Sequence, residues 1–477
     1  MGKERTPVPE KELYILEADE PSPDTIRELI DFNIGYQLRG LRYFAWLKLK
    51  WEKDNPGRTF PGLCAEVDSI SGEFRPLKDQ RAWSWGDTRG LGLWCYFLQK
   101  GRIPDEDTAI EVDGDPVTVN LKDFYTAYCK HIYACLKERL QTCAGKIPFL
   151  VDIETNQASD DPRNLQPGEH EFIGTHIFAI NAFFQYAMWQ NDDEALATAW
   201  KILEENFRAA HENRFVNHLT RRPSFTHSHG SMMVSAGALV DTLKTVDLLA
   251  SRGDTRYNDM QAQLIAAGRW GLDIFLGYHW NPTDKLFCEY LHPVSKTAFK
   301  NELDHIICDP GHTAEGVGFF AEFSRWLPAQ ADNFRFNGAN TVPLLGDVLK
   351  FVDDHGYSDK GVMYKNIDII TLKGIADVRN DDGQWKTAPW WNIRECAAAA
   401  CRMYALTKDA RMWAIYKRAF NTVYANYANL NIGGLFLQTL DAENLEPLPF
   451  HPATGNLDPM HSPRAREREI EALEELL

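Results

Sequence analysis

The fold is decided by the stretch from Phe172 to His211, which reads FIGTHIFAINAFFQYAMWQNDDEALATAWKILEENFRAAH. Its first half carries no formal charge but includes several polar side chains, so it predicts a buried helix rather than a membrane span. Apolar residues in the second half recur at intervals of four, three and four, which places them on one helix face: Leu196, Trp200, Leu203 and Phe207. The polar turn at 191–193 separates the halves. The stretch therefore predicts two antiparallel helices joined as an αα-hairpin.

The same pattern recurs along the chain, with further polar turns at 251–254 and 407–410. The periodicity predicts helices over 24–52, 86–100, 118–142, 172–190, 193–211, 230–251, 255–276, 312–327, 340–354, 392–406, 409–428 and 462–477. These form six pairs, and six helical hairpins can close into a ring. We therefore predict an all-α fold, an (α/α)6 barrel with short β-hairpins in its long connections. An open helical solenoid is the alternative, but it would show a stricter sequence repeat.

Four connections are too long to be idle in a compact domain: 144–171, 277–311, 355–391 and 429–461. We expect them to gather at one end of the barrel and to build a site there. Strand signals are confined to connections, at 278–290 and 434–439. No Pro/Ser-rich linker divides the chain, so we expect residues 1–23 to form an arm and residues 24–477 to form a single catalytic domain.

Composition narrows the class of protein. The 477 residues are 44% hydrophobic and 25% charged, which excludes a disordered or collagen-like chain. The net charge of −17 argues against a nucleic-acid or anionic-membrane partner, because phosphate binding requires clustered Lys and Arg. The nine cysteines include no CxxC pair, and the N-terminal segment lacks the apolar core of a signal peptide. These features predict reduced thiols in a cytoplasmic protein.

The strongest candidates for catalytic residues stand in the segment Asp309-Pro310-Gly311-His312-Thr313-Ala314-Glu315. Asp309 is a good N-cap and Pro310 a good first helical residue, so His312 lies in the first turn of a helix. The positive end of the helix dipole disfavours imidazolium there, and a neutral imidazole is what a general base needs. Glu315, on the same helix face, could orient His312 or contact a substrate. A capped helix with a buried histidine is the alternative.

Other histidines are weaker candidates by themselves. His461 precedes the last helix beside a capping Ser462, a pattern that also fits an ordinary loop histidine. His176 lies on a strongly apolar helix, where a hydrogen-bonded core histidine is common. His227 and His229 have no Cys or carboxylate at metal-ligand spacing nearby, so we expect no metal and no cofactor.

Four tryptophans lie in segments expected to face the barrel cavity: Trp83, Trp85, Trp390 and Trp391. Indole faces suit the apolar faces of sugar rings, although such residues are more often core. Arg89 follows four residues after Trp85 and could form a structural ion pair or stabilise a developing oxyanion. For Arg394 and Glu395 a helix-end salt bridge is the simplest interpretation.

Taken together, these segments resemble the N-acylglucosamine 2-epimerase family, which includes cellobiose 2-epimerases and mannose isomerases. Six segments match in the family's order across about residues 60 to 465: Lys78–Arg89, Thr175–His176, Ser231–Met233, Pro310–Glu315, Trp390–Glu395 and Met460–Arg464. Two departures are Gly316 after Glu315, followed by Val317-Gly318 where many members carry bulky aromatics, and a chain longer than that of typical members.

The resemblance implies an (α/α)6 barrel, no obligatory metal and an unphosphorylated sugar substrate. It implies that His312 and His461 are the two acid/base groups and that Arg89 contacts substrate. It also implies that His176 lines the cavity and that Glu395 lies near the sugar. We expect Glu315, Trp85, Trp390 and Trp391 to complete the substrate site.

The expected function is therefore a sugar isomerase or epimerase, acting on a reducing sugar as a monomer or homodimer. One histidine would remove the C2 proton to give an enediol or enediolate, and reprotonation would give 2-epimerisation or aldose–ketose isomerisation. His176 is a candidate for assisting ring opening. The alternatives are an (α/α)6-barrel glycoside hydrolase that uses Glu315 and Glu395 as its carboxylate pair, and a sugar-binding protein without catalysis.

Overall fold

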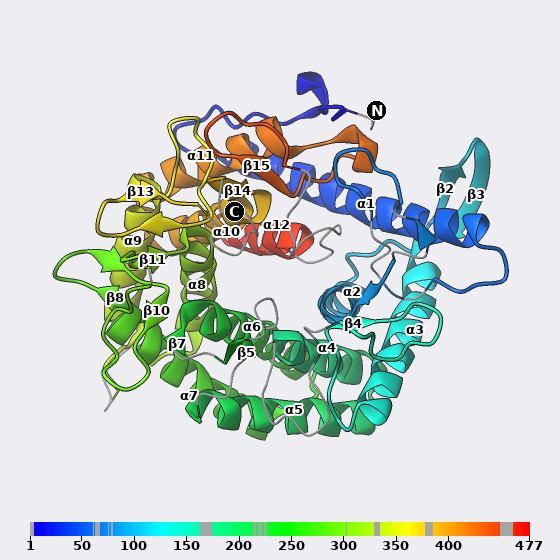
Figure 1. Cartoon of the computed structure of the whole chain (residues 1–477), viewed down its shortest axis with the longest axis horizontal. Coiled ribbons are helices and arrows are strands. Elements are labelled where there is room, and N and C mark those ends of the chain that lie inside the picture. The colour runs from blue at the N-terminus through cyan, green and yellow to red at the C-terminus, as the bar shows by residue number, and fades with distance from the viewer. Residues whose placement is uncertain are drawn as a thin grey trace.

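The helices of the protein form two concentric rings (Figure 1). The computed structural model describes residues 4–60, 62, 67–74, 76–77, 80–161, 164, 174–212, 216–217, 222–223, 227–301, 303–328, 334–376, 385–448 and 461–477. The inner ring consists of α2 (Ser84–Lys100), α4 (Gly174–Gln190), α6 (His229–Ser251), α8 (Pro310–Phe323), α10 (Trp390–Thr407) and α12 (His461–Glu474). The outer ring consists of α1 (Pro23–Asp54), α3 (Leu121–Thr142), α5 (Asp193–His211), α7 (Asn258–Ile274), α9 (Gly338–His355) and α11 (Ala410–Tyr427). The predicted (α/α)6 barrel is confirmed.

The six pairs are not all hairpins. Five inner helices pack against the outer helix that follows them in sequence, as predicted for the turns at 191–193, 251–254 and 407–410. The sixth pair joins α1 to α12, the first and last helices of the chain. The inner ring then closes between α12 and α2, where the Tyr96 hydroxyl donates to Glu471 at 2.8 Å and Arg102 Nε donates to Glu467 at 3.0 Å. The ring therefore depends on contacts between the two ends of the sequence.

The α4–α5 hairpin shows how local sequence fixes the turn. Asn191 adopts a left-handed backbone with φ of 56°, which asparagine tolerates better than most residues. Asp192 then accepts a hydrogen bond from the backbone N–H of Ala195 at 2.9 Å and caps the first turn of α5. The side chain of Phe207, expected on the apolar face of α5, lies outside the described residues.

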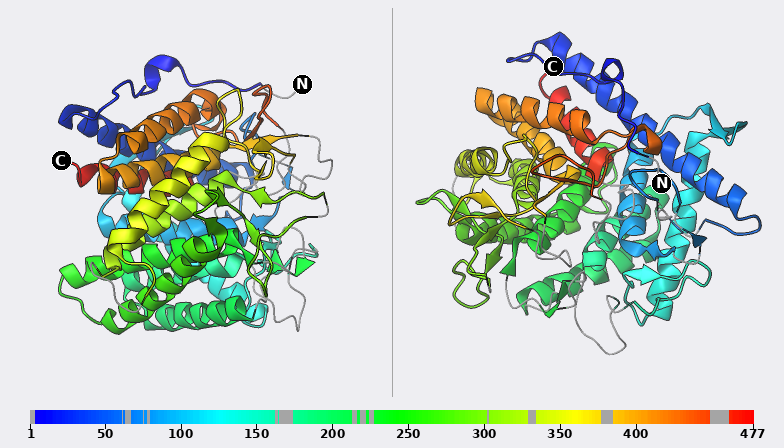
Figure 2. Two further views of the ribbon diagram at one scale, coloured as in Figure 1. Left: turned by 90° about the vertical axis from the view of Figure 1, so that its left-hand side faces the viewer. Right: turned by 45° about the horizontal axis from the view of Figure 1, so that its top comes forward.

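Short strand pairs tie the long connections to one another. The pairs are β1 (Ala82–Trp83) with β4 (Leu150–Val151), β5 (Val216–Asn217) with β6 (Arg222–Pro223), β7 (His227–Ser228) with β10 (Tyr290–Leu291), β8 (Trp280–Asn281) with β9 (Leu286–Phe287), and β14 (Thr387–Pro389) with β15 (Thr439–Asp441). A three-stranded sheet joins β11 (Ile307–Cys308), β12 (Ile367–Asp368) and β13 (Lys373–Gly374). These strands lie to one side of the helices in Figure 2, left. The connections therefore gather at one end, as predicted.

One hairpin was not expected. Strands β2 (Asp107–Val112) and β3 (Asp115–Asn120) pair around Asp113 and Gly114, whose φ angles are 55° and 81°. An Asp-Gly pair with two positive φ angles is typical of a tight hairpin turn. The predicted helix from residue 118 therefore begins at Leu121, because residues 118–120 belong to β3.

The last helix is unusual in composition. Helix α12 reads HSPRAREREIEALE. From His461 to Leu473 every residue except Pro463 and Glu471 is nevertheless buried, because the helix belongs to the inner ring. Buried charges require partners of opposite charge. Several charged residues of α12 have such partners on neighbouring helices. Arg468 pairs with Asp241 of α6 at 2.9 Å, and Glu469 pairs with Arg394 of α10 at 2.5 Å. The helix-end salt bridge considered for Arg394 is therefore present, with Glu469 as its partner.

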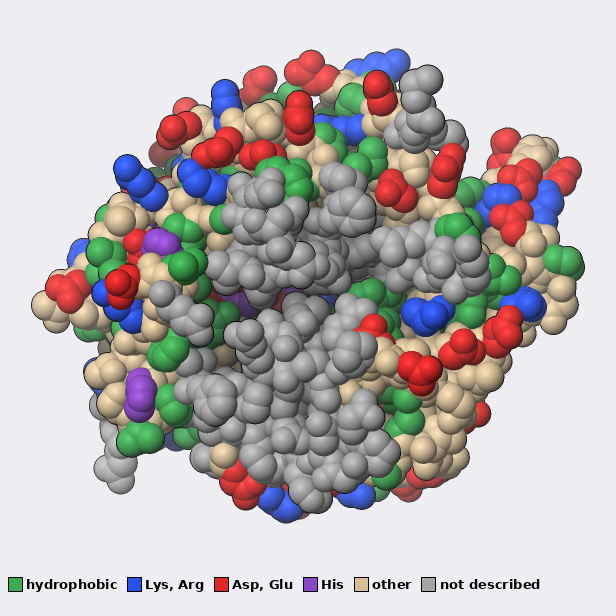
Figure 3. Space-filling view, viewed as in Figure 1, with side chains coloured by type: hydrophobic (Ala, Val, Ile, Leu, Met, Phe, Trp, Pro, Cys, Tyr) green, Lys and Arg blue, Asp and Glu red, His purple; other side chains and the backbone are tan. Residues whose placement is uncertain are grey.

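The outer surface carries the N-terminal residues and mixed charge. Leu16 and Asn421 of α11 exchange two hydrogen bonds of 2.9 Å, which hold the segment before α1 against the outer ring. On the face shown in Figure 3, the described Lys and Arg side chains alternate with Asp and Glu rather than form one basic patch. None of the helices in the described part of the chain is long and apolar enough to span a bilayer. The eight cysteines in that part are free thiols, and Cys64 lies outside it.

Candidate active site

His312 lies in the first turn of α8, as predicted. The Asp309 carboxylate caps this helix by accepting from the backbone N–H groups of Gly311 at 3.1 Å and His312 at 3.2 Å. The Nδ1 atom of His312 lies 3.2 Å from Oε1 of Glu289 and 3.1 Å from Oδ2 of Asp309. With Nδ1–H donating to a carboxylate, the neutral ring carries its lone pair on Nε2. His312 is thus oriented as a proton acceptor.

The carboxylate partner Glu289 is buried and held in place. It accepts a hydrogen bond from the backbone N–H of Gly230 at 2.8 Å. Burial raises the pKa of this carboxyl, but the charge and hydrogen bond of His312 outweigh burial and lower the pKa to about 2. A Cβ atom at Gly230 would lie 2.9 Å from Cε1 of His312 and 3.1 Å from Oε1 of Glu289. The glycine at the start of α6 therefore makes room for the pair.

His461 forms a second histidine–carboxylate pair. It is the first residue of α12, and its Nδ1 lies 2.7 Å from Oε1 of Glu395 on α10. Burial raises the pKa of the Glu395 carboxyl, but the positive charge of Arg464 and the hydrogen bond from His461 hold the pKa well below its ordinary value. The ionised carboxylate accepts the Nδ1 proton, so the lone pair of the neutral ring is again on Nε2.

The Trp391 ring lies close to both histidines. Its ring centroid is 5.3 Å from that of His312 and 5.3 Å from that of His461, with His461 stacked at an interplanar angle of 21°. The two imidazole centroids therefore cannot be farther apart than twice 5.3 Å. The ammonium of Lys365 lies 4.3 Å from the centroid of the same indole and also pairs with Asp309. One small sugar could contact both imidazoles.

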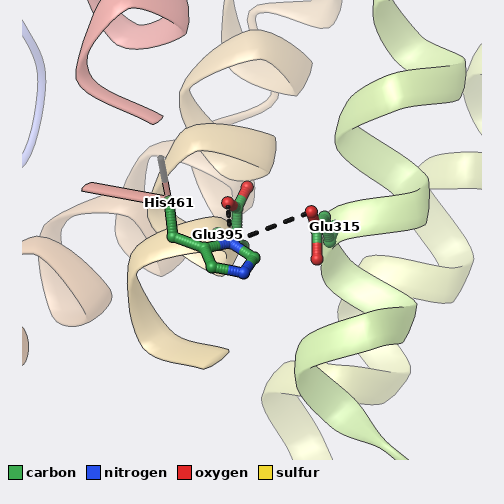
Figure 4. A group of neighbouring side chains, drawn as sticks. All are labelled: Glu315, Glu395 and His461. Carbon is green, nitrogen blue, oxygen red and sulfur yellow. Dashed lines mark hydrogen bonds and ion pairs between the residues drawn. The ribbon is translucent and has the colours of Figure 1, made fainter. Parts of the chain in front are cut away.

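Arg464 joins the predicted carboxylates. Its Nη2 atom donates to Oε1 of Glu395 at 2.8 Å and also to Oε1 of Glu315. Figure 4 shows Glu315 on α8 facing Glu395 and His461. Ligand atoms of these three residues lie within 4.8 Å of one another, the one arrangement in the described chain that could hold a metal ion. The guanidinium of Arg464 bonds to both carboxylates and opposes a cation there.

Arg89 lines a cavity of the inner ring and lies against Trp85. The Arg89 guanidinium carbon lies 4.3 Å from the Trp85 ring centroid and 4.0 Å from that of Phe178, and these two rings stack at 5.5 Å. Both Arg89 and Arg464 line this cavity, which is enclosed by α2, α4, α6 and α12. Arg89 therefore lines the same cavity as Arg464, which bonds to Glu315 and Glu395.

Two further predicted residues have contacts in the surrounding packing, and the Trp390 ring also lies 6.3 Å from that of His461. His176 is 1% exposed, and its Nε2 accepts a hydrogen bond from the backbone N–H of Ile147 at 3.0 Å. Trp390 packs against Phe436 with ring centroids 5.2 Å apart and donates from Nε1 to Gln438 at 3.3 Å. Trp391, rather than Trp390, contacts both histidines.

The sequence reasoning missed Glu289, Arg464 and Lys365 as site residues. Arg464 stands in the motif around His461, three positions on, where a helix brings it to the same face. Glu289 and Lys365 stand in long connections, and no local spacing joins them to His312 or Asp309. The departure at Gly316 has a structural reason, because a Cβ atom there would lie 2.8 Å from Cε1 of His229. The His229 ring in turn contacts the backbone carbonyl of His312 through Nε2 at 2.9 Å.

Comparison with protein-family models and with curated protein sequences finds no match to this chain. Solved structures do resemble it. The cellobiose 2-epimerase from Bacillus thermoamylovorans B4167 gives a TM-score of 0.64 at 15% identity, over 92% of this chain and 98% of that chain. A sugar epimerase from a ruminal bacterium gives 0.62 at 13%, over 94% and 98%. A D-mannose isomerase gives 0.60 at 13%, over 97% and 99%. These likenesses agree with the (α/α)6 barrel that the sequence predicted.

Proposed function

We propose that this protein is a sugar isomerase that acts on the C2 proton of an unphosphorylated reducing sugar. The observation that carries the proposal is the pair of histidine–carboxylate dyads, His312 with Glu289 and His461 with Glu395, whose histidines both contact Trp391. Two general bases within reach of one small substrate are what removal and return of a carbon-bound proton require. The likeness of fold to cellobiose 2-epimerases and to a D-mannose isomerase supports the same reaction class.

The proposed reaction begins with the open-chain aldose, whose carbonyl acidifies the C2 proton. Nε2 of one histidine takes this proton, and the imidazolium that forms is stabilised through Nδ1–H by its carboxylate partner. The product of this step is an enediolate, with negative charge on the oxygen at C1. The second histidine then returns a proton to C2 from the other face, which inverts that centre.

We propose that Arg89 stabilises the oxyanion. It carries a permanent positive charge at the wall of the cavity, and its guanidinium lies against the rings of Trp85 and Phe178. Arg464 is a less suitable group, since Glu315 and Glu395 already accept its hydrogen bonds. We assign to Glu315 and Trp391 contacts with the sugar, and to His176 assistance with ring opening.

Epimerisation and ketose formation differ only in where the enediolate is reprotonated. Protonation of C2 from the opposite face gives the 2-epimer, whereas protonation of C1 gives the ketose. Two bases near one site favour 2-epimerisation, because each can serve one face of C2. A single base would suffice for the ketose.

Glycoside hydrolysis by Glu315 and Glu395 is disfavoured by their electrostatics. Such a reaction requires one carboxyl to be protonated near neutral pH as the general acid. Arg464 donates to both side chains, and the pKa of Glu395 lies well below its ordinary value because Arg464 and His461 outweigh the effect of burial. Two carboxylates held by one guanidinium form a scaffold rather than an acid–base pair.

Exchange in heavy water tests the proposal. Free aldoses, among them cellobiose, mannose and glucose, are incubated with the protein in D₂O and followed by NMR. We expect deuterium to enter at C2 of at least one sugar, together with the 2-epimer or ketose. Hydrolysis of a glycosidic bond without exchange would support a hydrolase. Binding of a sugar without exchange or cleavage would support a binding protein.

A further inference from the structure

A second cavity also borders α12 and shares no lining residue with the cavity that Arg89 lines. It is bounded by α1, α2, α10 and α12, and most of its wall is apolar, including Trp94, Trp390 and Phe436. The polar groups on its wall include Arg466, Ser462 and Gln37. The cavity has room for one species of about the size of a water molecule or a halide ion, and not for a sugar or a nucleotide.

Arg466 is a buried cation without a paired anion. It is 0% exposed, and no carboxylate of the described chain lies within ion-pair distance of it. Its Nε donates to the Tyr424 hydroxyl at 3.2 Å, while Nη1 and Nη2 have no hydrogen-bond partner among the described residues. The guanidinium carbon lies 4.5 Å from the Tyr36 ring centroid and 5.5 Å from that of Phe436. These rings attract a cation but do not neutralise it.

The carboxylate that could neutralise Arg466, that of Glu469, already has other partners. Glu469 lies one helical turn after Arg466 and interacts with it at longer range, but its carboxylate bonds to Arg394 at 2.5 Å and to Tyr416 at 3.4 Å. Two arginines therefore share one carboxylate in this part of the core. A buried charge left in that state is expensive, because the lost hydration is not replaced.

The other unpartnered groups on the wall are also donors. Ser462 is 3% exposed and Gln37 is 3% exposed, and within the described structure neither Oγ of Ser462 nor Nε2 of Gln37 has a hydrogen-bond partner. Ser462 also stands in the first turn of α12, where the helix dipole favours negative charge. A cation, an amide N–H₂, a hydroxyl and a helix N-terminus thus surround one small space.

We propose that this cavity binds a small monovalent inorganic anion, chloride in the first instance. The anion accepts hydrogen bonds from the Nη atoms of Arg466, from Ser462 and from Gln37, and it neutralises the charge that Glu469 leaves unpaired. Because Ser462 directly follows His461, the bound anion also fixes the first turn of α12. The proposal does not depend on the reaction catalysed.

Bromide serves as the probe for the position of the anion. Crystals grown in sodium bromide, with data collected at the bromine absorption edge, should show an anomalous peak in contact with Arg466 and Ser462. A water molecule at this position, with no anomalous signal in the cavity at saturating bromide, would overturn the proposal.

Thermal unfolding measures the binding. Protein dialysed into sodium gluconate is titrated with sodium chloride at constant ionic strength. We expect a saturable rise in Tm of about 1–3 °C, as for a ligand that binds only the folded state. Equal Tm values in chloride and gluconate would contradict the site.

Two variants separate anion binding from a general effect of salt. Arg466→Met removes the cation and should abolish the chloride response, whereas Arg27→Met on the exposed face of α1 should keep the wild-type response. Gln37→Glu places a carboxylate in the same cavity. It should raise Tm in gluconate and remove the chloride response, which keeps the test decisive if Arg466→Met does not fold. A Gln37→Glu variant that is destabilised and still responds to chloride would contradict the proposed anion site.

Discussion

The Nδ1 atom of His461 lies 2.7 Å from Oε1 of Glu395, although 66 positions separate the two residues in the sequence. The contact joins the first turn of the last helix to the second turn of α10. It fixes the ring with its second nitrogen as the proton acceptor, and it leaves Glu395 bonded to Arg464 as well. The same relationship recurs between His312 and Glu289. Loss of either carboxylate should therefore affect chemistry through the orientation of its histidine.

Replacing the orienting carboxylates tests this relationship directly. For Glu395→Gln and for Glu289→Gln we expect kcat to fall by about 10²–10⁴-fold, because an amide does not stabilise the imidazolium that forms during the reaction. The loss should fall on kcat more than on KM, because the position of the histidine changes and the contacts with the substrate remain. Steady-state kinetics provide the measurement. Glu443→Gln, on the surface, is the control, and an unchanged kcat in both site variants would contradict a positioning role.

Replacing His312 and His461 one at a time tests the separate role of each in proton transfer. His312→Ala and His461→Ala should each reduce turnover by at least about 10²-fold, the usual contribution of a general acid–base group. Both variants should fold. Glu289 keeps its hydrogen bond from Gly230, and Glu395 keeps Arg464. If the two histidines serve opposite faces of C2, each variant should still exchange deuterium from one face without inverting the centre. Near wild-type activity in either variant would remove that histidine from the mechanism.

Trp391 should matter for both histidines at once. An aromatic pair contributes about 0.5–1.5 kcal/mol beyond its buried area, and Trp391 makes one such contact with each imidazole. We expect Trp391→Leu to lower kcat/KM by about 10-fold or more. Trp413→Leu on the outer helix α11, where the indole is also buried, should lower Tm without a matching loss of activity. Equal kinetic effects in the two variants would argue against a specific role of Trp391.

Acid should destabilise the protein through the buried carboxylates. The pKa of Glu289 is lowered to about 2, because the charge and hydrogen bond of His312 outweigh burial. A carboxyl whose pKa is lower in the folded state contributes its stabilisation above its unfolded pKa and loses it as pH falls through the folded value. We therefore expect the loss between about pH 5 and pH 2, and Glu289 alone accounts for about 3 kcal/mol. Urea unfolding as a function of pH checks this slope, which should be shallower for Glu289→Gln. Equal slopes would show that Glu289 is not linked to stability.

Activity should survive removal of metal ions. Glu315, Glu395 and His461 form the one group in the described chain with ligand atoms close enough for a cation, but Arg464 bonds to both carboxylates. Dialysis against a chelator, followed by assay and by elemental analysis of the protein, provides the measurement. If activity were lost and one divalent ion restored it, a metal ion would have to displace Arg464 from the two carboxylates. His227, whose side chain lies outside the described residues, and His229 would then be examined as further ligands.

How far the sequence predicts the site depends on the range of the interactions involved. Asp309 and Glu315 each stand three positions from His312, so local rules were enough to place them together. The distance from His461 to Trp391 depends on packing between α12 and α10, which no local pattern encodes. The predicted pair Trp390 and Trp391 shows the difference. Adjacent positions on a helix face different directions, and only Trp391 contacts both imidazoles.

The sequence by itself determined the twelve helices, the polar turns between neighbouring pairs and the two histidines at helix starts, because periodicity, capping and turn chemistry act over a few residues. Only the tertiary structure decided that α1 pairs with α12, that Glu289 orients His312, and that a helix as charged as α12 lies inside the barrel. A charged helix can be buried only where other helices present opposite charges to it. Here those charges come from α6, α8 and α10, and closing the ring is what assembles them.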